Sequence, residues 1–394
     1  MHIKTLNEAD LKNKKVLLRV DFNVPIDHFG EVQDDTRIRE SLPTIREILR
    51  HDATLIIMTH FKRPKGVVVD EMRVNPIAEA LAGLLKKHVK KFDKIYSDDI
   101  KQQLHKSNPG EIYMLENIRF EPGEESCDEN FSKNLASLGD IFINDAFGTA
   151  HRKHSSTYGI ASHLPSFAGL LLEREIDALN PLLEAPNRPL TIIIGGAKID
   201  TKIALIRNFF DKADNILVGG GLANTFLAAA GYNVAKSLYE PEKLDIARDI
   251  MLEAEKHHEK FVLPSDCIVA NEIGEDVETL NVPIKDIEGD MRILDIGKQS
   301  AQRFAEIIEK SKTIIWNGPL GLYEYKPFQK GSLAVAEMVA HSPGYTVLGG
   351  GDTVDCVKRL GFKKDQFSHV STGGGAMLEF LEGKHLPGVE ALLG

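Results

Sequence analysis

Short apolar segments rich in β-branched residues recur along this chain and alternate with segments of helical period. They occupy residues 15–20, 53–59, 111–115, 140–144, 190–195, 215–219, 260–264, 312–316 and 345–349. None shows the polar–apolar alternation of a half-exposed strand, so each is predicted to be a strand buried on both faces. Because such strands alternate with helices, the sequence predicts an α/β fold with parallel sheets and right-handed crossovers.

Two domains are expected, because 394 residues exceed what one hydrophobic core usually organises. A helical pattern at 170–184 comes midway and is followed by "APNRP" at 185–189. A helix that ends in a proline-broken turn is a plausible domain junction. We therefore expect a first domain over 1–169, a linking helix and hinge over 170–185, and a second domain over 186–377.

The two halves differ in the residues that follow their strands. The first half supplies Arg, His, Lys, Asp and Asn, in "RVDFNVP", "THFKRPKG", "ENIRF" and "NDAFGTAHRKHSS". The second half supplies mainly glycines, in "GGAKIDTK", "GGGLANT", "NGPLG", "GGGDT" and "STGGGA". Ligands of open α/β sheets bind outside the carboxyl ends of the strands. Cations suit a small anion, whereas glycines let backbone N–H groups approach nucleotide phosphates, so we predict one ligand of each kind.

The charged residues of the glycine-rich segments could either bind phosphate and its metal ion or be ordinary surface and helix-capping residues. Lys198 and Lys202 lie one helical turn apart at an expected helix start, where like charges and the helix dipole disfavour them. This favours phosphate binding over two solvated lysines. Asp352 and Thr353 are placed to cap the next helix, or Asp352 contacts a Mg²⁺ carried by nucleotide phosphates. The glycine run of "STGGGA" is interpreted as an anion nest rather than a turn.

The polar residues of the first half also have structural alternatives. Arg19, Asp21 and Asn23 alternate and would share one side of an extended strand, or form a buried salt bridge. Arg37 precedes a helix, where a merely exposed charge is the alternative. The two histidines of "AHRKHSS" have no carboxylate or cysteine at ligand spacing, so a metal site there is not expected.

The net charge, the cysteine content and the lack of long apolar runs exclude several classes of binding partner. A formal charge of −10 argues against general binding to nucleic acid or anionic membranes. The three cysteines are far apart and predict neither a zinc site nor a disulfide framework. Without an apolar leader at the N-terminus or a run of roughly 18 apolar residues, a cytoplasmic protein with no membrane partner is expected.

Taken together, the motifs resemble the phosphoglycerate kinase family over essentially the whole chain. They run in order from "RVDFNVP" through "ENIRFEPGEE", "INDAFGTAHRKHSS", "GGGLANTFL" and "WNGPLGLYE" to "GGGDT" and "STGGGAMLEFLEGKHLPGV". The resemblance implies two doubly wound, Rossmann-like domains joined by a helix, with residues 378–394 returning to the first domain. It implies a hinge-bending monomer that transfers a phosphoryl group reversibly and in line between 1,3-bisphosphoglycerate with MgADP and 3-phosphoglycerate with MgATP.

The resemblance also implies the site residues. The phosphoglycerate site falls on Asp21, Asn23, Arg37, His60, Arg63, Arg119 and Arg152. The nucleotide site falls on Gly196, Lys198, Lys202, Gly220, Asn317, Glu324, Gly350, Gly351, Asp352 and Thr353. Glu324 is expected on the ribose and Asp352 on Mg²⁺. For catalysis we expect charge neutralisation by Arg37, Lys198, Lys202 and the backbone N–H groups of Gly373, Gly374 and Gly375.

Four residues depart from the usual family pattern: Phe61 and Lys62 in "HFKRPKG", Lys298 in "DIGK", and Thr201 in "IDTK", where many members carry Asp although Thr also occurs among bacterial members. Phe61 and Lys62 either point away from the site or add a cation at its mouth. The alternative function is a dinucleotide-dependent oxidoreductase, which should carry GxGxxG, a pattern that the chain lacks. The choice between ATP and GTP stays open at the level of sequence.

Overall fold

The computed structural model describes residues 2–200, 202–256 and 261–394, which form two compact units. Thr201 lies outside the residues that the structure describes. Unit 1 is the chain up to Asn180 together with Lys384–Gly394, and unit 2 is Pro181–Gly383. Helix α6 (Leu170–Glu184) covers the range that the sequence predicts for it. The domain boundaries at 169, 185 and 377 stay a prediction.

A six-stranded parallel sheet forms the centre of unit 1, in the order β3-β4-β2-β1-β5-β6. Its strands are β1 (Lys15–Arg19), β2 (Thr54–Met58), β3 (Val89–Lys91), β4 (Ile112–Met114), β5 (Ile141–Asn144) and β6 (Ser166–Ala168). Val16 and Leu18 pack in one core cluster with residues of α1 (Thr36–Arg50) and α2 (Asn75–Leu85). Leu17 packs in a second cluster with residues of α3 (Asp98–His105) and α5 (Glu129–Ala136). Both faces are therefore covered, which explains why the strands are apolar throughout.

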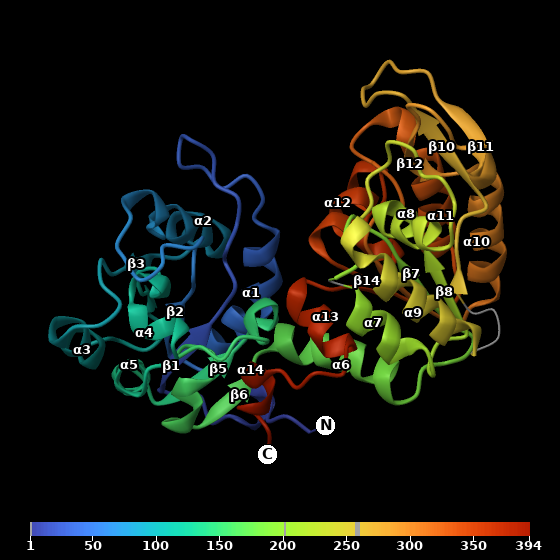
Figure 1. Ribbon diagram of the computed structural model, residues 1–394. Helices are drawn as coiled ribbons and strands as arrows, with labels where there is room; N and C mark the ends of the chain where they lie inside the picture. The colour runs from blue at the N-terminus through green and yellow to red at the C-terminus, as the bar shows by residue number, and fades with distance from the viewer. Residues whose placement is uncertain (1, 201, 257–260) are drawn as a thin grey trace. The chain divides into compact units, whose positions relative to one another are not determined.

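The two ends of the chain meet in unit 1. Ile3 pairs with Leu393 in an antiparallel bridge, and Thr5 pairs with Ala168 of β6 in a parallel bridge. Figure 1 shows the N- and C-terminal ends near β6. The short helix α14 (Pro387–Glu390) contributes the Gly388 carbonyl, which accepts a hydrogen bond from Asn144 Nδ2 at 3.2 Å.

Unit 2 holds a second six-stranded parallel sheet, in the order β15-β14-β13-β7-β8-β9. Its strands are β7 (Leu190–Ile194), β8 (Asn215–Val218), β9 (Phe261–Val262), β13 (Thr313–Asn317), β14 (Tyr345–Gly349) and β15 (His369–Val370). Its helices are α7 (Ile203–Phe209), α8 (Gly220–Ala229), α9 (Leu244–Glu255), α10 (Lys298–Lys310), α11 (Lys330–Ala340), α12 (Gly351–Arg359) and α13 (Gly375–Leu381). Trp316 lies at the centre of a core that includes Phe304 of α10 and Val335 of α11.

A small antiparallel sheet in unit 2 was not predicted. It consists of β10 (Asp266–Ala270), β11 (Leu280–Pro283) and β12 (Arg292–Ile296), in the order β11-β10-β12. Its inner residues Cys267 and Val269 pack with Leu227 of α8. The sequence did not reveal it because β11 is largely exposed and lacks an apolar run.

The predicted α/β class is confirmed, and each of the nine apolar segments contains a strand. Among the helices that the structure describes, none is both long and apolar enough to cross a bilayer.

Candidate functional site

In unit 1, polar side chains converge beyond the carboxyl ends of β1 and β2. Asp21 follows β1 and forms an ion pair with Arg37 in the first turn of α1. Its other carboxylate oxygen lies 3.8 Å from Nδ1 of His60, which follows β2. Burial raises the pKa of Asp21, but the positive charges of Arg37 and Arg19 oppose this effect, and the pKa of Asp21 lies below its usual value. The carboxylate is therefore charged and positioned by two neighbouring segments.

The predicted alternation of Arg19, Asp21 and Asn23 on one extended strand is wrong, because β1 ends at Arg19. Asn23 lies in the loop that follows. Its Oδ1 accepts a hydrogen bond from the N–H of Lys62 at 2.9 Å, which joins this loop to the one after β2.

The departures at Phe61 and Lys62 have a structural explanation. Phe61 is buried in the core of unit 1, and its N–H donates to Asn117 Oδ1 at 3.1 Å. Its carbonyl accepts from Asn117 Nδ2 at 2.8 Å. Lys62 is exposed, and its ammonium group lies 5.0 Å from the centroid of the Phe61 ring. Phe61 therefore points into the core, and Lys62 folds back over its ring.

Arg119 and Arg152 bring two further cations to this edge. Arg119 is 3% exposed and donates through Nη1 to the Lys62 carbonyl at 2.8 Å, but its Nη2 is buried without a hydrogen-bond partner. Burial, then the charge of Arg152, lowers the pKa of Arg119. Burial also lowers the pKa of His60 well below its ordinary value, so its ring is neutral. Arg119 also pairs through Nε with the half-exposed Glu125 at 3.2 Å, whereas Arg152 is only partly buried. A buried cation that is repelled by a neighbouring cation and retains a free donor suits an anion with several oxygens.

Arg63 is exposed in the loop after β2, beside this cluster in sequence. Of the phosphoglycerate residues expected from the sequence, Asp21, Arg37 and His60 are in direct contact, and Arg119 and Arg152 interact through their charges.

Arg19 anchors a buried network whose other members were not singled out from the sequence. Its Nε donates to Ser156 Oγ at 2.9 Å, and Ser156 Oγ donates to Glu124 Oε1 at 2.6 Å. Burial lowers the pKa of Arg19 to about 10, while Glu124 and Asp21 oppose the shift. Arg19 is thus buried in a hydrogen-bonded network and interacts with Glu124 and Asp21 through its charge. Glu124 lies within "EPGEE", where a run of acids resembles an exposed surface.

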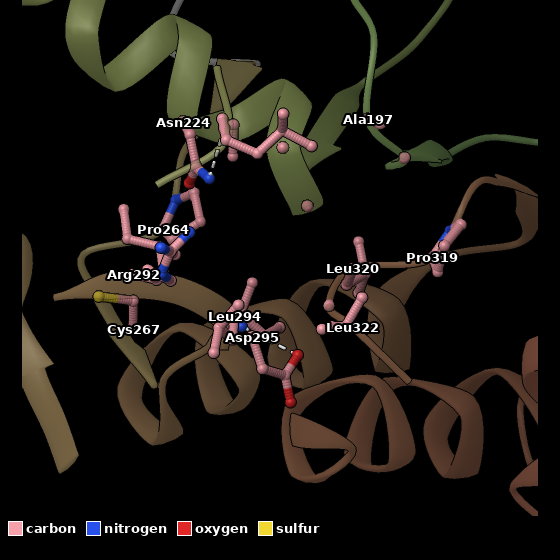
Figure 2. Close-up of a pocket in the computed structure, with 18 of the residues that line it drawn as sticks. Ala197, Asn224, Pro264, Cys267, Arg292, Leu294, Asp295, Pro319, Leu320 and Leu322 are labelled. Carbon is pink, nitrogen blue, oxygen red and sulfur yellow. Dashed lines mark hydrogen bonds between the residues drawn. The ribbon is translucent and has the colours of Figure 1, made fainter. Parts of the chain in front are cut away.

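In unit 2, a pocket of about 340 Å³ lies between the start of α8, the loop after β13, and β12. It brings together four of the residues expected on the nucleotide, which are Gly196, Gly220, Glu324 and Asp352. In Figure 2, Ala197, Pro319 and Leu320 are seen on one side of it. Motifs separated by more than a hundred residues thus line one cavity.

Two glycines of this pocket, Gly220 and Gly196, have different structural roles. Gly220 has a φ of +65°, and a Cβ there would come within 2.8 Å of the Gly196 carbonyl oxygen. It therefore allows two loops to pack together. Gly196 has a φ of +101°, and a Cβ there would meet nothing within 4 Å, so its backbone borders open space. A ligand can approach the main chain at this point.

Lys202, one of the residues expected on the nucleotide phosphates, is buried. It is 8% exposed, and Nζ donates to Oδ1 of Asn317 at the end of β13. Burial lowers the pKa of Lys202 to about 8, with the charge of Asp352 opposing the shift. Asn317 Nδ2 donates to the Gly349 carbonyl at 2.7 Å, and the Thr353 hydroxyl donates to the same carbonyl at 2.7 Å. Asn317 and Thr353 therefore join the ends of β13 and β14.

Two predictions about helix ends are wrong. Helix α7 begins at Ile203, so Lys198 and Lys202 do not share a helical face, and Lys198 is exposed in the preceding loop. The N-cap of α12 is Gly350, with a φ of +93° that favours glycine. Asp352 therefore lies inside the first turn and does not cap the helix. Its exposed carboxylate lines the pocket instead.

The remaining candidates are backbone groups. Gly351 begins α12 with open space where a Cβ would be. Gly374 has a φ of +51°, Gly375 begins α13, and the N–H of Gly373 donates to Ser371 Oγ at 3.0 Å.

Within the ranges that the structure describes, no group of three or more His, Cys, Asp or Glu side chains is arranged to hold a metal ion. A single exposed carboxylate such as Asp352 fits Mg²⁺, which keeps several waters and takes further oxygens from phosphates.

The chain matches a family model described as phosphoglycerate kinase over residues 6–384. It is 46% identical to a phosphoglycerate kinase of Roseiflexus sp. (strain RS-1) over 391 residues, which is 99% of this chain and 98% of the relative. Among solved structures, phosphoglycerate kinase from Coxiella burnetii matches with a TM-score of 0.91 and 39% identity, covering 99% of both chains. Phosphoglycerate kinase from Pyrococcus horikoshii OT3 matches with a TM-score of 0.84 and 32% identity, covering 99% of this chain and 98% of that one.

Proposed function

The chain belongs to the phosphoglycerate kinase family, and from this premise we propose how its two sites divide the reaction. It is a glycolytic kinase that uses ATP and ADP, and the comparisons give no support to an oxidoreductase. We propose that the cluster in unit 1 binds phosphoglycerate and that the pocket in unit 2 binds the nucleotide. The main support for placing phosphoglycerate in unit 1 comes from Arg119. Its buried Nη2 has no hydrogen-bond partner, and its charge is repelled by that of Arg152.

In unit 1, Arg119, Arg152 and the exposed Arg63 would hold the phosphate of 3-phosphoglycerate, because guanidinium groups fork onto phosphate oxygens. Asp21 and Asn23 would orient the end that carries the hydroxyl and the carboxylate. His60 is neutral and can therefore offer one donor and one acceptor to the substrate or to Asp21.

Arg37 would neutralise charge on the transferring group. It is the more exposed partner of its ion pair, with 40% of its side chain accessible against 13% for Asp21. Its side chain can therefore turn toward a ligand at little desolvation cost.

In unit 2, the backbones of Gly196, Gly220, Gly350 and Gly351 would border the nucleotide, and Glu324 would bind its ribose. Lys202 would donate to a phosphate, with Asn317 and Thr353 holding the strand ends in place. Lys198 and the N–H groups of Gly374 and Gly375 would neutralise charge in the transition state, and the N–H of Gly373 would join them on leaving Ser371 Oγ. Asp352 would hold Mg²⁺, which supplies charge neutralisation on the phosphate oxygens when bound.

Phosphoryl transfer to a carboxylate requires only the kinds of residues that these two sites contain. The attacking group is the substrate carboxylate, which is ionised at neutral pH and needs no general base. Transfer is direct and in line: the carboxylate oxygen forms a bond to the γ-phosphorus while the bond from phosphorus to the bridging oxygen of ADP breaks. A loose transition state of this kind is stabilised by positioning and charge, without a covalent nucleophile.

A coupled assay with 3-phosphoglycerate and ATP tests the proposal, first with Mg²⁺ and then after chelation. Turnover that requires Mg²⁺ and returns when the metal is restored is expected. Activity that is unchanged by chelation would contradict the role of Asp352. We also propose that the enzyme is a cytoplasmic monomer, and light scattering after size exclusion should give the mass of one 43.7 kDa chain.

A further inference from the structure

The nucleotide pocket continues past the residues assigned to phosphate and ribose. Its far wall is formed by Asn224 and Leu227 of α8, Cys267 of β10 and Leu294 of β12. Figure 2 shows Asn224 and Cys267 on the side of the pocket away from Ala197, Pro319 and Leu320. Because phosphates are drawn to Lys202 and the ribose to Glu324, the base is the part of the nucleotide that enters this more apolar end.

Asn224 is the unusual member of this wall. It is 2% exposed, and its Nδ2 donates to the Leu238 carbonyl at 3.0 Å. This bond fixes the amide orientation, because a flipped amide would set two oxygens against each other. Its Oδ1 is buried and has no hydrogen-bond partner. Buried acceptors are usually paired, so this oxygen is poised for a donor that the protein itself does not supply.

Asp295 and Cys267, which line the same pocket, already have partners. Asp295 accepts from the N–H of Gly331 at 2.6 Å and from its neighbour Ile296 at 2.9 Å. The Cys267 thiol donates weakly toward the Val282 carbonyl, with sulfur 3.8 Å from the oxygen. Asn224 therefore offers this wall an acceptor that is both buried and unpaired.

We propose that Asn224 accepts a hydrogen bond from the exocyclic amino group of a 6-aminopurine, and that it thereby selects adenine over guanine nucleotides. This assignment rests on the proposed nucleotide site. Adenine carries an N–H donor at C6, whereas guanine carries the acceptor O6 at the same position. A guanine base would set O6 against Oδ1 and leave two acceptors unpaired, which is the mismatch by which binding sites discriminate most strongly.

The test compares three nucleotides in the Mg²⁺-dependent assay with 3-phosphoglycerate: ATP, GTP, and purine riboside triphosphate, which has only hydrogen at C6. For the wild-type enzyme, kcat/KM should be about ten-fold higher for ATP than for purine riboside triphosphate, and lower still for GTP. In Asn224→Leu the advantage of ATP over purine riboside triphosphate should disappear, and the ratio of ATP to GTP should fall about ten-fold or more.

Asn233→Leu is the matched control, since the Asn233 amide also donates to a carbonyl, that of Ile287, but does not line the pocket. Its nucleotide ratios should equal those of the wild type. The ratios are measured on one protein, so a general loss of stability in Asn224→Leu would not imitate the effect.

Equal kcat/KM for ATP and purine riboside triphosphate in the wild type would overturn the assignment, as would an unchanged ratio of ATP to GTP in Asn224→Leu. Either result leaves turnover with 3-phosphoglycerate intact. Failure of the proposed function would instead appear as the absence of turnover with every nucleotide.

Discussion

The ammonium group of Lys202 donates a hydrogen bond to the side-chain oxygen of Asn317, and both side chains are buried at the carboxyl end of β13. A neutral amide balances a buried cation only in part, so burial holds the pKa of Lys202 at about 8. A bound phosphate would favour the charged form.

Lys202→Met should weaken nucleotide binding about 10- to 100-fold at pH 7, the range for losing a hydrogen bond to a charged group. In the wild type, affinity should fall as the pH rises above about 8, because the free enzyme then loses the proton that the phosphate needs. Calorimetry at several pH values measures both effects, with proton uptake near pH 8 in the wild type alone. Lys310→Met, at the exposed end of α10, is the control. Equal Kd values for Lys202→Met and the control would refute the role.

Arg37→Ala should lower kcat on the order of 10³-fold, if Arg37 neutralises the transferring group as an arginine finger does. Arg39 is the matched control, since it lies two residues away on α1 and pairs with Asp35 at 2.7 Å on the surface. Arg39→Ala should leave kcat unchanged in steady-state kinetics. A near-normal kcat for Arg37→Ala would remove Arg37 from the catalytic residues.

Arg119→Met should remove binding of 3-phosphoglycerate at only a modest cost to the stability of the free protein. The substitution loses the hydrogen bond from Nη1 to the Lys62 carbonyl and the ion pair with Glu125, but it also removes the buried and unpaired Nη2. Thermal unfolding with and without 3-phosphoglycerate measures both quantities. The wild-type Tm should rise with ligand, and the variant's should not. A ligand-induced rise in the variant would contradict the assignment.

Asp145→Asn should flatten the pH dependence of stability in unit 1. Burial raises the pKa of Asp145 to about 7, although the N–H of Leu171 donates to its Oδ1 at 2.9 Å. Because the folded protein favours the neutral form of Asp145, this group contributes its full stabilisation below about pH 4. That contribution to the free energy of unfolding is lost as the pH rises through about 7.

The variant keeps the Oδ1 acceptor and carries no charge at any pH. Between about pH 4 and pH 7, the free energy of unfolding of the variant should therefore fall by up to a few kcal/mol less than that of the wild type, at about 1.4 kcal/mol per pKa unit. Hydrogen exchange of the β5 amides reports on unit 1, whereas the single tryptophan, Trp316, lies in unit 2. Equal pH profiles for the variant and the wild type would refute the prediction.

The Phe61→Leu and Lys62→Gly double variant should leave the KM for 3-phosphoglycerate unchanged, because Phe61 packs in the core and Lys62 folds over its ring. The separate changes should affect stability in opposite directions. Lys62→Gly should stabilise by about 1 kcal/mol, since Lys62 has a φ of +54°. Phe61→Leu should destabilise by a similar amount, about 1 kcal/mol, through altered packing. A KM that changes several-fold would show that Lys62 reaches the substrate.

Much of the fold could be predicted because burial on both faces leaves a strong pattern. Val16, Leu17 and Leu18 are all fully buried although they point to opposite faces, so β1 has no polar position. β11 has the opposite character: it is mostly exposed, so no period distinguishes it from a loop. The pocket wall formed by the small antiparallel sheet was therefore not predicted, and nothing in the sequence indicated that Asn224 of α8 lines the same pocket.

The sequence by itself determined which chemical groups stand at the ends of the strands, because the order of strands, glycines and cations is local information. Only the tertiary structure decided which of them act together. Lys202 and Asn317 are 115 residues apart, and Arg19 and Ser156 are 137 apart. Hydrogen bonding and desolvation depend on distances of a few ångströms in space, so the neutral ring of His60, the depressed pKa of Lys202 and the unpaired oxygen of Asn224 exist only in the folded chain.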